Sequence, residues 1–314
     1  MTQLGTSGLD VSTLCLGTNV FGWTADEATS HAVLDAYVAG GGNFIDTADV
    51  YSAWVDGNSG GDSEAIIGTW LAENQDKRDS LVVATKVSQL APNKGLGRDA
   101  ILGAADASLQ RLQTDRIDLY WAHYDDPGTP LEETLAAFGE LLDAGKVRAI
   151  GASNYSAPRL AEALAIADRE GLPKYVALQP EYNLVAREEY ESTLAPLVAE
   201  HDLATVPYYG LASGFLTGKY RPGGAAVDSP RAGGAAKLLE QPSAVAVLEA
   251  LDEVAAAHDA PVAAVALAWL AAQPHVAAPI ASARTVEQLA DLLPVNELQL
   301  TADEVDRLTS ASVA

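Results

Sequence analysis

The stretch 44–51 reads FIDTADVY and the stretch 81–86 reads LVVATK, and these two segments decide the fold. Each is a short apolar run that ends on a reactive side chain, Asp46 in the first and Lys86 in the second. Tyr51 follows shortly after the first run. Short apolar runs are typical of strands that are buried on both faces, as in a parallel sheet. We therefore predict two such strands, one ending on an acid that is soon followed by a phenol and the other ending on an amine.

The same pattern recurs along the chain. A third run, 117–123 (IDLYWAH), ends on His123, and apolar runs alternate with longer stretches of helical period. This alternation predicts repeated βα units around a parallel sheet, an α/β fold of the (β/α)8 TIM-barrel type. In such a barrel the carboxyl ends of all strands meet at one face, so the four side chains are expected to converge. The predicted strands lie near residues 14–17, 44–46, 81–86, 119–123, 147–151, 176–179, 204–208 and 276–280.

Turn and cap residues complete the predicted barrel. The opening stretch 4–11 (LGTSGLDV) has glycines at turn positions and predicts a small N-terminal β-hairpin that caps the barrel floor. Two stretches rich in glycine, 52–62 and 210–242, are predicted as long loops after the second and seventh strands. Polar residues mark the starts of predicted helices at Thr24, Asp99 and Ser156.

Length and charge limit the class of protein. At 314 residues and 48% hydrophobic, the chain is expected to form one barrel domain spanning 1–314. Its formal charge of -24 arises from 43 acids against 19 bases, spread along the chain. This argues against nucleic acid or an anionic membrane as a partner. No apolar run approaches the roughly 18 residues of a membrane span, so a cytoplasmic protein is expected.

Cysteine and histidine usage argues against a metal site. Cys15 is the only cysteine, which excludes an internal disulfide, and its leucine neighbours predict a buried thiol. The five histidines are isolated, with no pair at i, i+4. The chain also has no Gly-x-Gly-x-x-Gly after a strand and no phosphate loop. We therefore expect no metal, no Rossmann domain and no nucleotide-hydrolase site.

Each strand-end residue also has an ordinary structural explanation. Asp46 can cap a helix, Tyr51 can pack with its hydroxyl in water, and His123 can be a hydrogen-bonded structural histidine. Lys86 is harder to explain, because burying an ammonium costs several kcal/mol unless a carboxylate pairs with it. The four together at equivalent positions favour a reactive site.

The charges of these four groups indicate one kind of chemistry. An unperturbed phenol has a pKa of about 10, and a neighbouring ammonium such as that of Lys86 is expected to lower the pKa of Tyr51. Asp46 would keep the lysine charged and oriented. His123 could donate a hydrogen bond to a substrate oxygen. The set suits proton donation to a carbonyl oxygen that is becoming an alkoxide.

On these motifs the chain resembles the aldo-keto reductases, a family of (β/α)8 barrels that pass hydride between a nicotinamide cofactor and a carbonyl group. The resemblance extends from the first predicted strand to the last helix. The order and spacing of the motifs make it specific, although single pieces are weak. The matching segments are LGT (16–18), DTA (46–48) with Tyr51, TK (85–86), YWAH (120–123), GASN (151–154), QPEYN (179–183) and GFLTGK (214–219).

The resemblance implies a catalytic role for each member of the tetrad. Tyr51 would give its proton to the carbonyl oxygen, Lys86 would tune the phenol, Asp46 would hold the lysine, and His123 would orient the carbonyl. It also implies that Tyr208 stacks on the nicotinamide ring. The alternative for the residues after Tyr208 is an ordinary glycine-rich loop. The cofactor-binding residues implied are Gly17, Thr18, Asn19, Asp46, Ser153, Asn154, Gln179, Tyr208, Tyr209, Leu211, Ser213, Ser282, Arg284 and Gln288.

The adenosine end departs from the family pattern. The turn after the last strand reads PIASAR (279–284), and Leu292 occupies the place where relatives commonly have asparagine. Ser282 and Arg284 can still contact a 2′-phosphate, since a guanidinium pairs well with phosphate oxygens. The expected cofactor is NADPH, with NADH possible; the alternative is that Arg284 is merely solvated.

The substrate is expected to be a small molecule with a carbonyl group. Phe21, Trp23, Trp54 and Tyr124 follow predicted strands, where barrel loops build the pocket, and such rings favour an apolar or aromatic carbonyl compound. The alternative is that these rings pack within the loops.

Three functions remain in view. The first is an NADPH-dependent oxidoreductase that reduces aldehydes or ketones. The second is a nicotinamide-binding, redox-sensing regulatory subunit with little turnover. The third, a barrel glycosidase, would need a second carboxylate about 5–10 Å from Asp46, where lysine and tyrosine stand instead. The sequence leaves the choice between a monomer and a homo-oligomer open.

Overall fold

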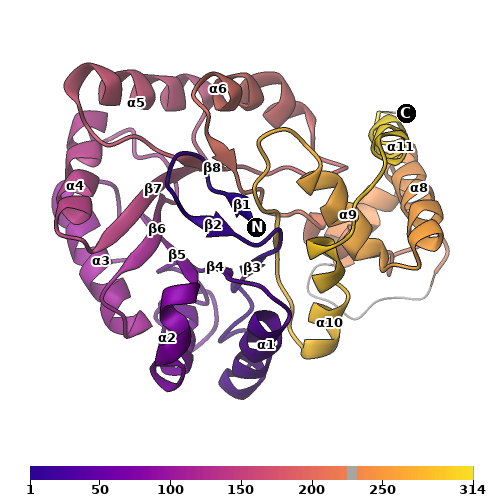
Figure 1. Ribbon diagram of the computed structural model, residues 1–314, viewed down its shortest axis with the longest axis horizontal. Coiled ribbons are helices and arrows are strands. Elements are labelled where there is room, and N and C mark those ends of the chain that lie inside the picture. Colours follow the sequence, from indigo (N-terminus) through magenta and orange to yellow (C-terminus); the bar gives the residue numbers. More distant parts are fainter. Residues whose placement is uncertain (225–231, 314) are drawn as a thin grey trace.

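The computed structural model describes residues 1–224 and 232–313, and its centre is a parallel sheet. Eight strands run in the order β10-β3-β4-β5-β6-β7-β8-β9, and every neighbouring pair is parallel. Helices surround this sheet (Figure 1), which confirms the predicted (β/α)8 barrel. The strands are β3 Cys15–Gly17, β4 Phe44–Asp46, β5 Val82–Val87, β6 Ile117–Ala122, β7 Val147–Ser153, β8 Ala177–Gln179, β9 Ala204–Thr205 and β10 Ile280–Ala281.

Alternate residues of each strand face opposite sides of the sheet. Phe44, Val82 and Leu119 belong to one buried cluster, which also includes the hairpin residues, and therefore fill the barrel interior. Ile45 and Val83 belong to the other cluster, which packs the sheet against the helices. This period of two also turns the last residues of the strands inward.

The eighth strand is shorter than predicted. Regular pairing with β3 covers only Ile280 and Ala281, whereas we predicted a strand over 276–280. Val276 makes an isolated parallel bridge with Thr205, so the segment still joins β9 to β3 and closes the barrel. Pro279 lies between the two contacts and has no N–H to donate, which interrupts the ladder.

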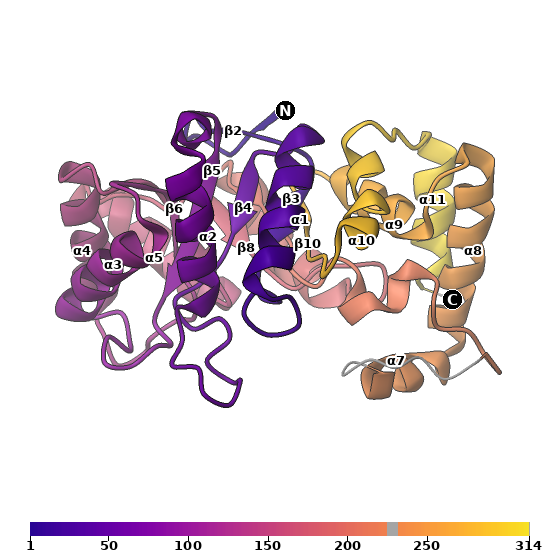
Figure 2. The same ribbon diagram turned by 90° about the horizontal axis from the view of Figure 1, so that it is seen from below.

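The predicted hairpin is present at the barrel floor. β1 (Thr2–Gln3) pairs antiparallel with β2 (Asp10–Val11), so residues 4–9 form its turn. Gly5 has φ +52°, and a Cβ there would lie 2.3 Å from the carbonyl oxygen of Val176, so the turn needs glycine. Figure 1 shows the hairpin across the middle of the sheet, and in Figure 2 it lies at the end opposite the long loops.

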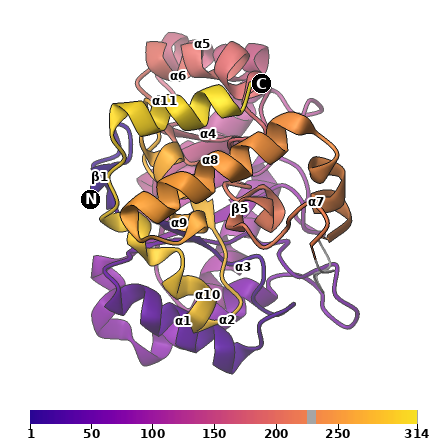
Figure 3. The same ribbon diagram turned by 90° about the vertical axis from the view of Figure 1, so that its right-hand side faces the viewer.

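The helices lie outside the sheet, and two begin at other residues than predicted. Asp26, not Thr24, caps α1, and its side chain accepts from the N–H of Thr29. The helix predicted after Asp99 begins at Arg98. Figure 3 shows α8 and α11 side by side on the outer surface. The helices are α1 Glu27–Ala39, α2 Asp62–Glu73, α3 Arg98–Leu112, α4 Leu131–Asp143, α5 Ala157–Glu170, α6 Ala195–Glu200, α7 Ala232–Leu239, α8 Pro242–His258, α9 Val262–Ala271, α10 Val286–Ala290 and α11 Ala302–Ala311, with short turns η1 Gln75–Ser80, η2 Tyr190–Leu194, η3 Ala212–Thr217 and η4 Leu293–Asn296.

The two predicted long loops differ in structure. Residues 52–61 lack helix and strand, as predicted. The stretch 210–242 instead contains η3 and α7, while residues 225–231 lie outside the described part of the chain. The predicted loop is therefore partly helical, because Leu238 and Leu239 pack against the core and Ala235 is buried.

Two further expectations concern Cys15 and membrane-spanning helices. Cys15 is buried in the barrel interior, as predicted, and burial raises its pKa well above the usual value. Within residues 1–224 and 232–313, no single helix is long and apolar enough to cross a membrane. Only α8 and α9, joined across a bend of 98°, reach that length and composition.

Candidate active site

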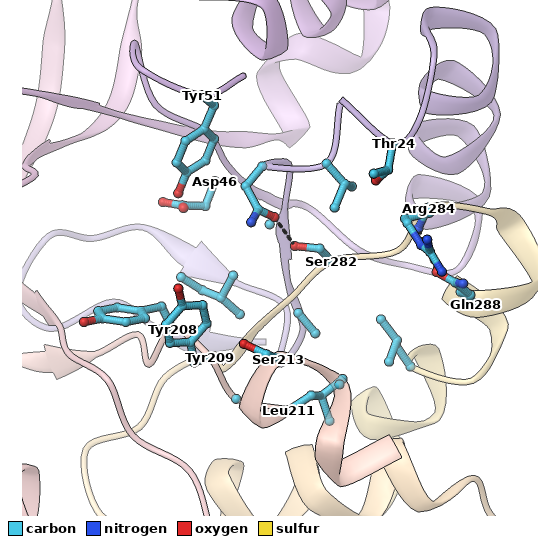
Figure 4. Close-up of a pocket in the computed structure, with 18 of the residues that line it drawn as sticks. Thr24, Asp46, Tyr51, Tyr208, Tyr209, Leu211, Ser213, Ser282, Arg284 and Gln288 are labelled. Atoms are coloured by element: carbon cyan, nitrogen blue, oxygen red, sulfur yellow. Dashed lines mark hydrogen bonds between the residues drawn. The ribbon is translucent and has the colours of Figure 1, made fainter. Parts of the chain in front are cut away.

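An elongated cavity of about 860 Å³ opens at the carboxyl ends of the strands. One end is lined by Asp46 and Tyr51, and the other reaches Arg284 and Gln288 beside α10. Figure 4 shows these two pairs at opposite ends, with Tyr208 and the residues after it along one side. The cavity therefore links the predicted reactive groups to the predicted adenosine end.

Three members of the predicted tetrad form one bonded group. Lys86 is fully buried, and its Nζ donates to a carboxylate oxygen of Asp46, to the carbonyl oxygen of Thr47 at 2.7 Å and to the hydroxyl of Tyr51 at 3.0 Å. Lys86 does not line the cavity, whereas Asp46 and Tyr51 do. The amine thus acts through the phenol and not directly on a ligand.

Asp46 has further partners on its second carboxylate oxygen. That oxygen accepts from Nε1 of Trp121 at 3.0 Å and from Nε2 of Gln179 at 3.2 Å. Trp121 was absent from the predicted site, although YWAH contains it at an inward position of β6. Gly151 makes room for its ring, because a Cβ there would lie 2.3 Å from the indole.

The electrostatics of the pair Lys86 and Tyr51 correct one expectation. Burial lowers the pKa of Lys86, but Asp46 and Tyr51 raise it by more, so the amine stays charged. Burial raises the pKa of Tyr51, and the opposing effect of Lys86 does not cancel it. The expected net lowering of the Tyr51 pKa is therefore wrong. The phenol is protonated at neutral pH, which is the state a proton donor needs.

His123 stands beside this group as a neutral imidazole. Burial and then Lys86 lower the pKa of His123 well below its usual value. Its ring centroid lies 6.2 Å from that of Tyr51, and its Nδ1 has no hydrogen-bond partner among the described residues. Asn154 holds the adjacent backbone by donating to the carbonyl oxygen of His123 at 2.9 Å.

The residues predicted to hold nicotinamide form a connected set. Asn154 Nδ2 donates to Ser153 Oγ at 3.1 Å, and Asn154 Oδ1 accepts from the hydroxyl of Tyr208 at 2.8 Å. Ser153 Oγ donates to the backbone oxygen of Gln179 at 2.9 Å. All four side chains line the cavity next to Asp46. The Tyr208 ring is thus held in place by a hydrogen bond at its far end.

The segment after Tyr208 lines the middle of the cavity. Tyr209, Leu211 and Ser213 all contribute to this lining, and Tyr209 and Ser213 have positive φ of 54° and 56°. Such a backbone is costly for non-glycine residues and is common at ligand-binding loops. Thr217 and Lys219 line the same stretch although the prediction left them out. Their presence in GFLTGK was the available signal.

The adenosine end carries one free guanidinium. Arg284 lines the cavity, and its side chain has no carboxylate partner within the described ranges. Gln288 is anchored, since its Oε1 accepts from the backbone N–H of Arg284 at 3.0 Å. Ser282 Oγ donates to Asn19 Oδ1 at 2.8 Å, the bond drawn in Figure 4. Gly17 lies here too, where a Cβ would crowd Ile280 and Ser282. Leu292 adds an apolar contact to this end.

Besides Lys86, two other predicted site residues lie outside the cavity lining. Thr18 is fully buried, and its hydroxyl donates to the backbone oxygen of Asp46 at 3.0 Å, so its side chain is structural. Phe21 is fully buried in the helix-side core and cannot contact a substrate. Trp23, Trp54 and Tyr124 do line the cavity, at the end near Tyr51.

The described residues also bear on metal binding. Within residues 1–224 and 232–313, no group of three or more histidine, cysteine or acidic side chains is placed to hold a metal ion. The polar side chains that line the cavity are amides, hydroxyls, the cations Lys219 and Arg284, the carboxylates of Asp46 and Asp291, and the imidazole of His123.

Comparison with known proteins places the chain in a family. The family model described as the Aldo/keto reductase family matches residues 13–313. An uncharacterized oxidoreductase, YrpG, of Bacillus subtilis is 37% identical over 95% of this chain and 91% of its own length. Protein tas of Escherichia coli is 34% identical over 95% of this chain and 93% of its length. A probable voltage-gated potassium channel subunit beta of Arabidopsis thaliana is 35% identical over 91% and 88%. The chain therefore belongs to the aldo/keto reductase family of oxidoreductases.

Proposed function

We propose that this protein reduces aldehydes or ketones to alcohols with NADPH, and that Tyr51 is the proton donor. The observation that carries the proposal is the single buried ammonium of Lys86, bonded at once to Asp46 and to the Tyr51 hydroxyl. A protonated phenol at the wall of a cavity, next to a neutral imidazole, is the arrangement that carbonyl reduction requires.

The proposed roles follow from charge and position. A bound nicotinamide nucleotide would supply the hydride. Tyr51 donates its proton to the carbonyl oxygen as negative charge develops there, and the ammonium of Lys86 stabilises the phenolate that remains. Asp46 keeps Lys86 charged and directed at the phenol. His123 faces the same region and orients the carbonyl oxygen, because a neutral imidazole can donate a hydrogen bond without competing as an acid.

The cavity fits a nicotinamide dinucleotide along its length. Ser153, Asn154 and Gln179 would hold the carboxamide beside Tyr208, although Asn154 must exchange one of its present hydrogen bonds. Lys219 would meet the pyrophosphate. We propose NADPH over NADH because Arg284, free of a carboxylate partner among the described residues, is available for a 2′-phosphate.

The first test measures binding and turnover in one experiment. The purified protein is titrated with NADPH and with NADH by fluorescence, and 4-nitrobenzaldehyde is then added. We expect tighter binding of NADPH and its consumption after the aldehyde is added. Tyr51→Phe should retain the Kd for NADPH and lose about 10²–10⁴-fold in kcat, since it removes a proton donor and little volume. Undiminished turnover by Tyr51→Phe would refute the acid assignment.

A second candidate is a nicotinamide-binding regulatory subunit with little turnover. It is supported by the relative named as a probable potassium channel subunit beta. The same titration separates the two candidates. Binding of NADPH without its consumption across a panel of aldehydes would favour the regulatory function.

A further inference from the structure

Aromatic rings form a continuous wall at the reacting end of the cavity. Trp23 meets Trp54 edge to face at 5.8 Å, and Trp54 meets Tyr51 at 6.3 Å. On the other side of Tyr51 the chain of contacts continues through His123, at 6.2 Å, to Tyr124, at a further 5.0 Å. All five side chains line the cavity. The proposed proton donor is thus the middle ring of five.

Two rings of this wall, one on each side of Tyr51, are open to a ligand. Trp54 is 50% exposed and Tyr124 is 45% exposed, although both are large and mostly apolar. Exposed rings gathered at the mouth of a cavity typically mark a binding surface. A flat ligand that covers them gains binding free energy from burying each ring face, and aromatic ring pairs add about 0.5–1.5 kcal/mol beyond that burial.

The positively charged side chains of the lining lie toward the end of the cavity opposite the rings. Among the described lining residues, Lys219 and Arg284 are the cations, and both lie on the nucleotide side. Lys86 is already paired with Asp46. Gln89, which lines the cavity near the rings, is neutral, and Lys94 in the same loop lies outside the lining.

Negative charge lies near Tyr208, on acids outside the cavity lining. Glu181 pairs with Tyr208 through an isolated parallel bridge, and its charge contributes, after burial, to raising the pKa of Tyr208. The pKa of Glu181 is itself raised by burial and by Glu189. An anionic group that entered this end would lose water and gain no cation, and the charge of Glu181 acts from outside the cavity lining. Each of those effects opposes its binding.

We propose that the ring-lined end accepts uncharged aromatic aldehydes and ketones and discriminates against carbonyl compounds that carry a carboxylate or phosphate. This inference rests on the proposed reductase function. The specificity resides in two separate features: the exposed rings favour flat apolar groups, and the placement of charge disfavours anions.

The test uses two substrates that differ only in charge, methyl 4-formylbenzoate and 4-formylbenzoate. Both present the same ring and the same aldehyde. With saturating NADPH at pH 7.5, we expect kcat/KM for the ester to exceed that for the acid by about 30-fold, mainly through KM. Equal values would overturn the inference while leaving the reductase function standing. Consumption of NADPH with neither compound would count against both.

A variant that adds a positive charge tests the cause of the discrimination between ester and acid. Gln89→Lys introduces a cation at the ring-lined end and should narrow the ratio between ester and acid by about tenfold, chiefly by raising kcat/KM for the acid. Glu181→Gln should narrow it less, by about threefold. Glu188→Gln is the matched control: like Glu181 it is an exposed acid outside the cavity lining, but it is not among the charges that raise the pKa of Tyr208, and it should leave the ratio unchanged. An unchanged ratio in Gln89→Lys would overturn the charge explanation.

Discussion

Asp46 and Asp49 lie three residues apart, and each has only 1% of its surface exposed, yet their surroundings are opposite. Asp46 faces the barrel interior and accepts hydrogen bonds from Lys86, Trp121 and Gln179. Neither carboxylate oxygen of Asp49 has a hydrogen-bond partner among the described residues. The comparison separates the effect of burial from the effect of partners.

The charged neighbours of Asp49 belong to the helix side of β5. There Glu64 accepts from the hydroxyl of Thr85 and from Nε of Arg111, the latter at 2.7 Å. Burial, followed by the charge of Glu64, raises the pKa of Asp49 to about 7. The nearby hydroxyl of Tyr120 is also buried without a partner in the described ranges.

The difference teaches what keeps a buried carboxylate ionised. Burial disfavours the charged form of a carboxyl group, and it is the largest cause of the raised pKa of Asp49. The ammonium and two N–H donors around Asp46 offset that cost, and the charge becomes available to orient Lys86. Around Asp49, burial and the charge of Glu64 outweigh the opposing effects of Arg111, the Val50 N–H and Lys86, so Asp49 holds a proton up to near neutral pH. Partners, not depth, decide which of the two carboxyl groups serves the reactive site.

The largest expected effect comes from Lys86→Met, which removes the partner that distinguishes Asp46 from Asp49. We expect kcat to fall by at least about 100-fold and the free energy of unfolding to fall by about 3–5 kcal/mol. Asp46 then becomes a buried acid with a raised pKa, so the loss of stability should grow from pH 5.5 to pH 8.5.

Urea unfolding at the two pH values and steady-state turnover check this prediction. Lys174→Met is the control, because it breaks an exposed lysine–aspartate pair and should change stability by less than about 1 kcal/mol. A destabilisation by Lys86→Met that is the same at both pH values would show that Asp46 does not take up a proton when its partner is lost.

The second effect has the opposite sign and comes from Asp49→Asn. The folded-state pKa of about 7 lies above the unfolded value of 3.8. The ionised Asp49 therefore lowers stability, with a cost that is absent below pH 3.8, grows up to pH 7 and is complete above it. Asparagine stays neutral, so the variant should gain up to about 4 kcal/mol over the wild type at pH 8.5.

At pH 5 the gain from Asp49→Asn should be less than half of that at pH 8.5, and the measurement is again the free energy of unfolding. Turnover should be retained, since Asp49 does not line the cavity. Asp56→Asn, at an exposed loop position, provides the control. An equal gain at both pH values would mean that Asp49 is ionised throughout this range.

The smallest effect concerns a donor to Asp46. Gly151→Ala forces a Cβ against the Trp121 ring and displaces its Nε1 from Asp46, which should cost about 1–3 kcal/mol of stability. Thermal unfolding measures this cost. Gly139→Ala is the matched control in α4, where a Cβ meets only ordinary contacts with Pro173, and it should not destabilise. Similar melting temperatures for Gly151→Ala and Gly139→Ala would show that the hydrogen bond from Trp121 to Asp46 does not contribute to stability.

Much of the barrel was predictable because its signals are local. The period of two in LVVATK places Lys86 on the inner face, and the alternation of strands and helices predicts the parallel sheet that the structure contains. The prediction failed for the eighth strand, where Pro279 interrupts pairing, and within 210–242, where α7 forms and packs on η3 and α8.

The site residues likewise divide into those that were predictable from the sequence and those that were not. The convergence of Asp46, Tyr51 and Lys86 follows from strand ends that meet at one face. Thr18 was assigned to the site by the family resemblance and Phe21 by its position after the first predicted strand, but the path of the chain beyond a strand end depends on tertiary packing. Trp121 and Lys219 were missed because a tryptophan and a lysine have many ordinary uses, and only their positions distinguish these two.

By itself, the sequence determined the order of strands and helices and the residues at the strand ends, since side-chain period and cap chemistry act between near neighbours. The tertiary structure alone decided the protonation of Tyr51, the contrast between Asp46 and Asp49, and the separation of cations from rings in the cavity. These properties depend on desolvation and on charges that long-range packing brings within a few ångströms, and no local pattern records those distances.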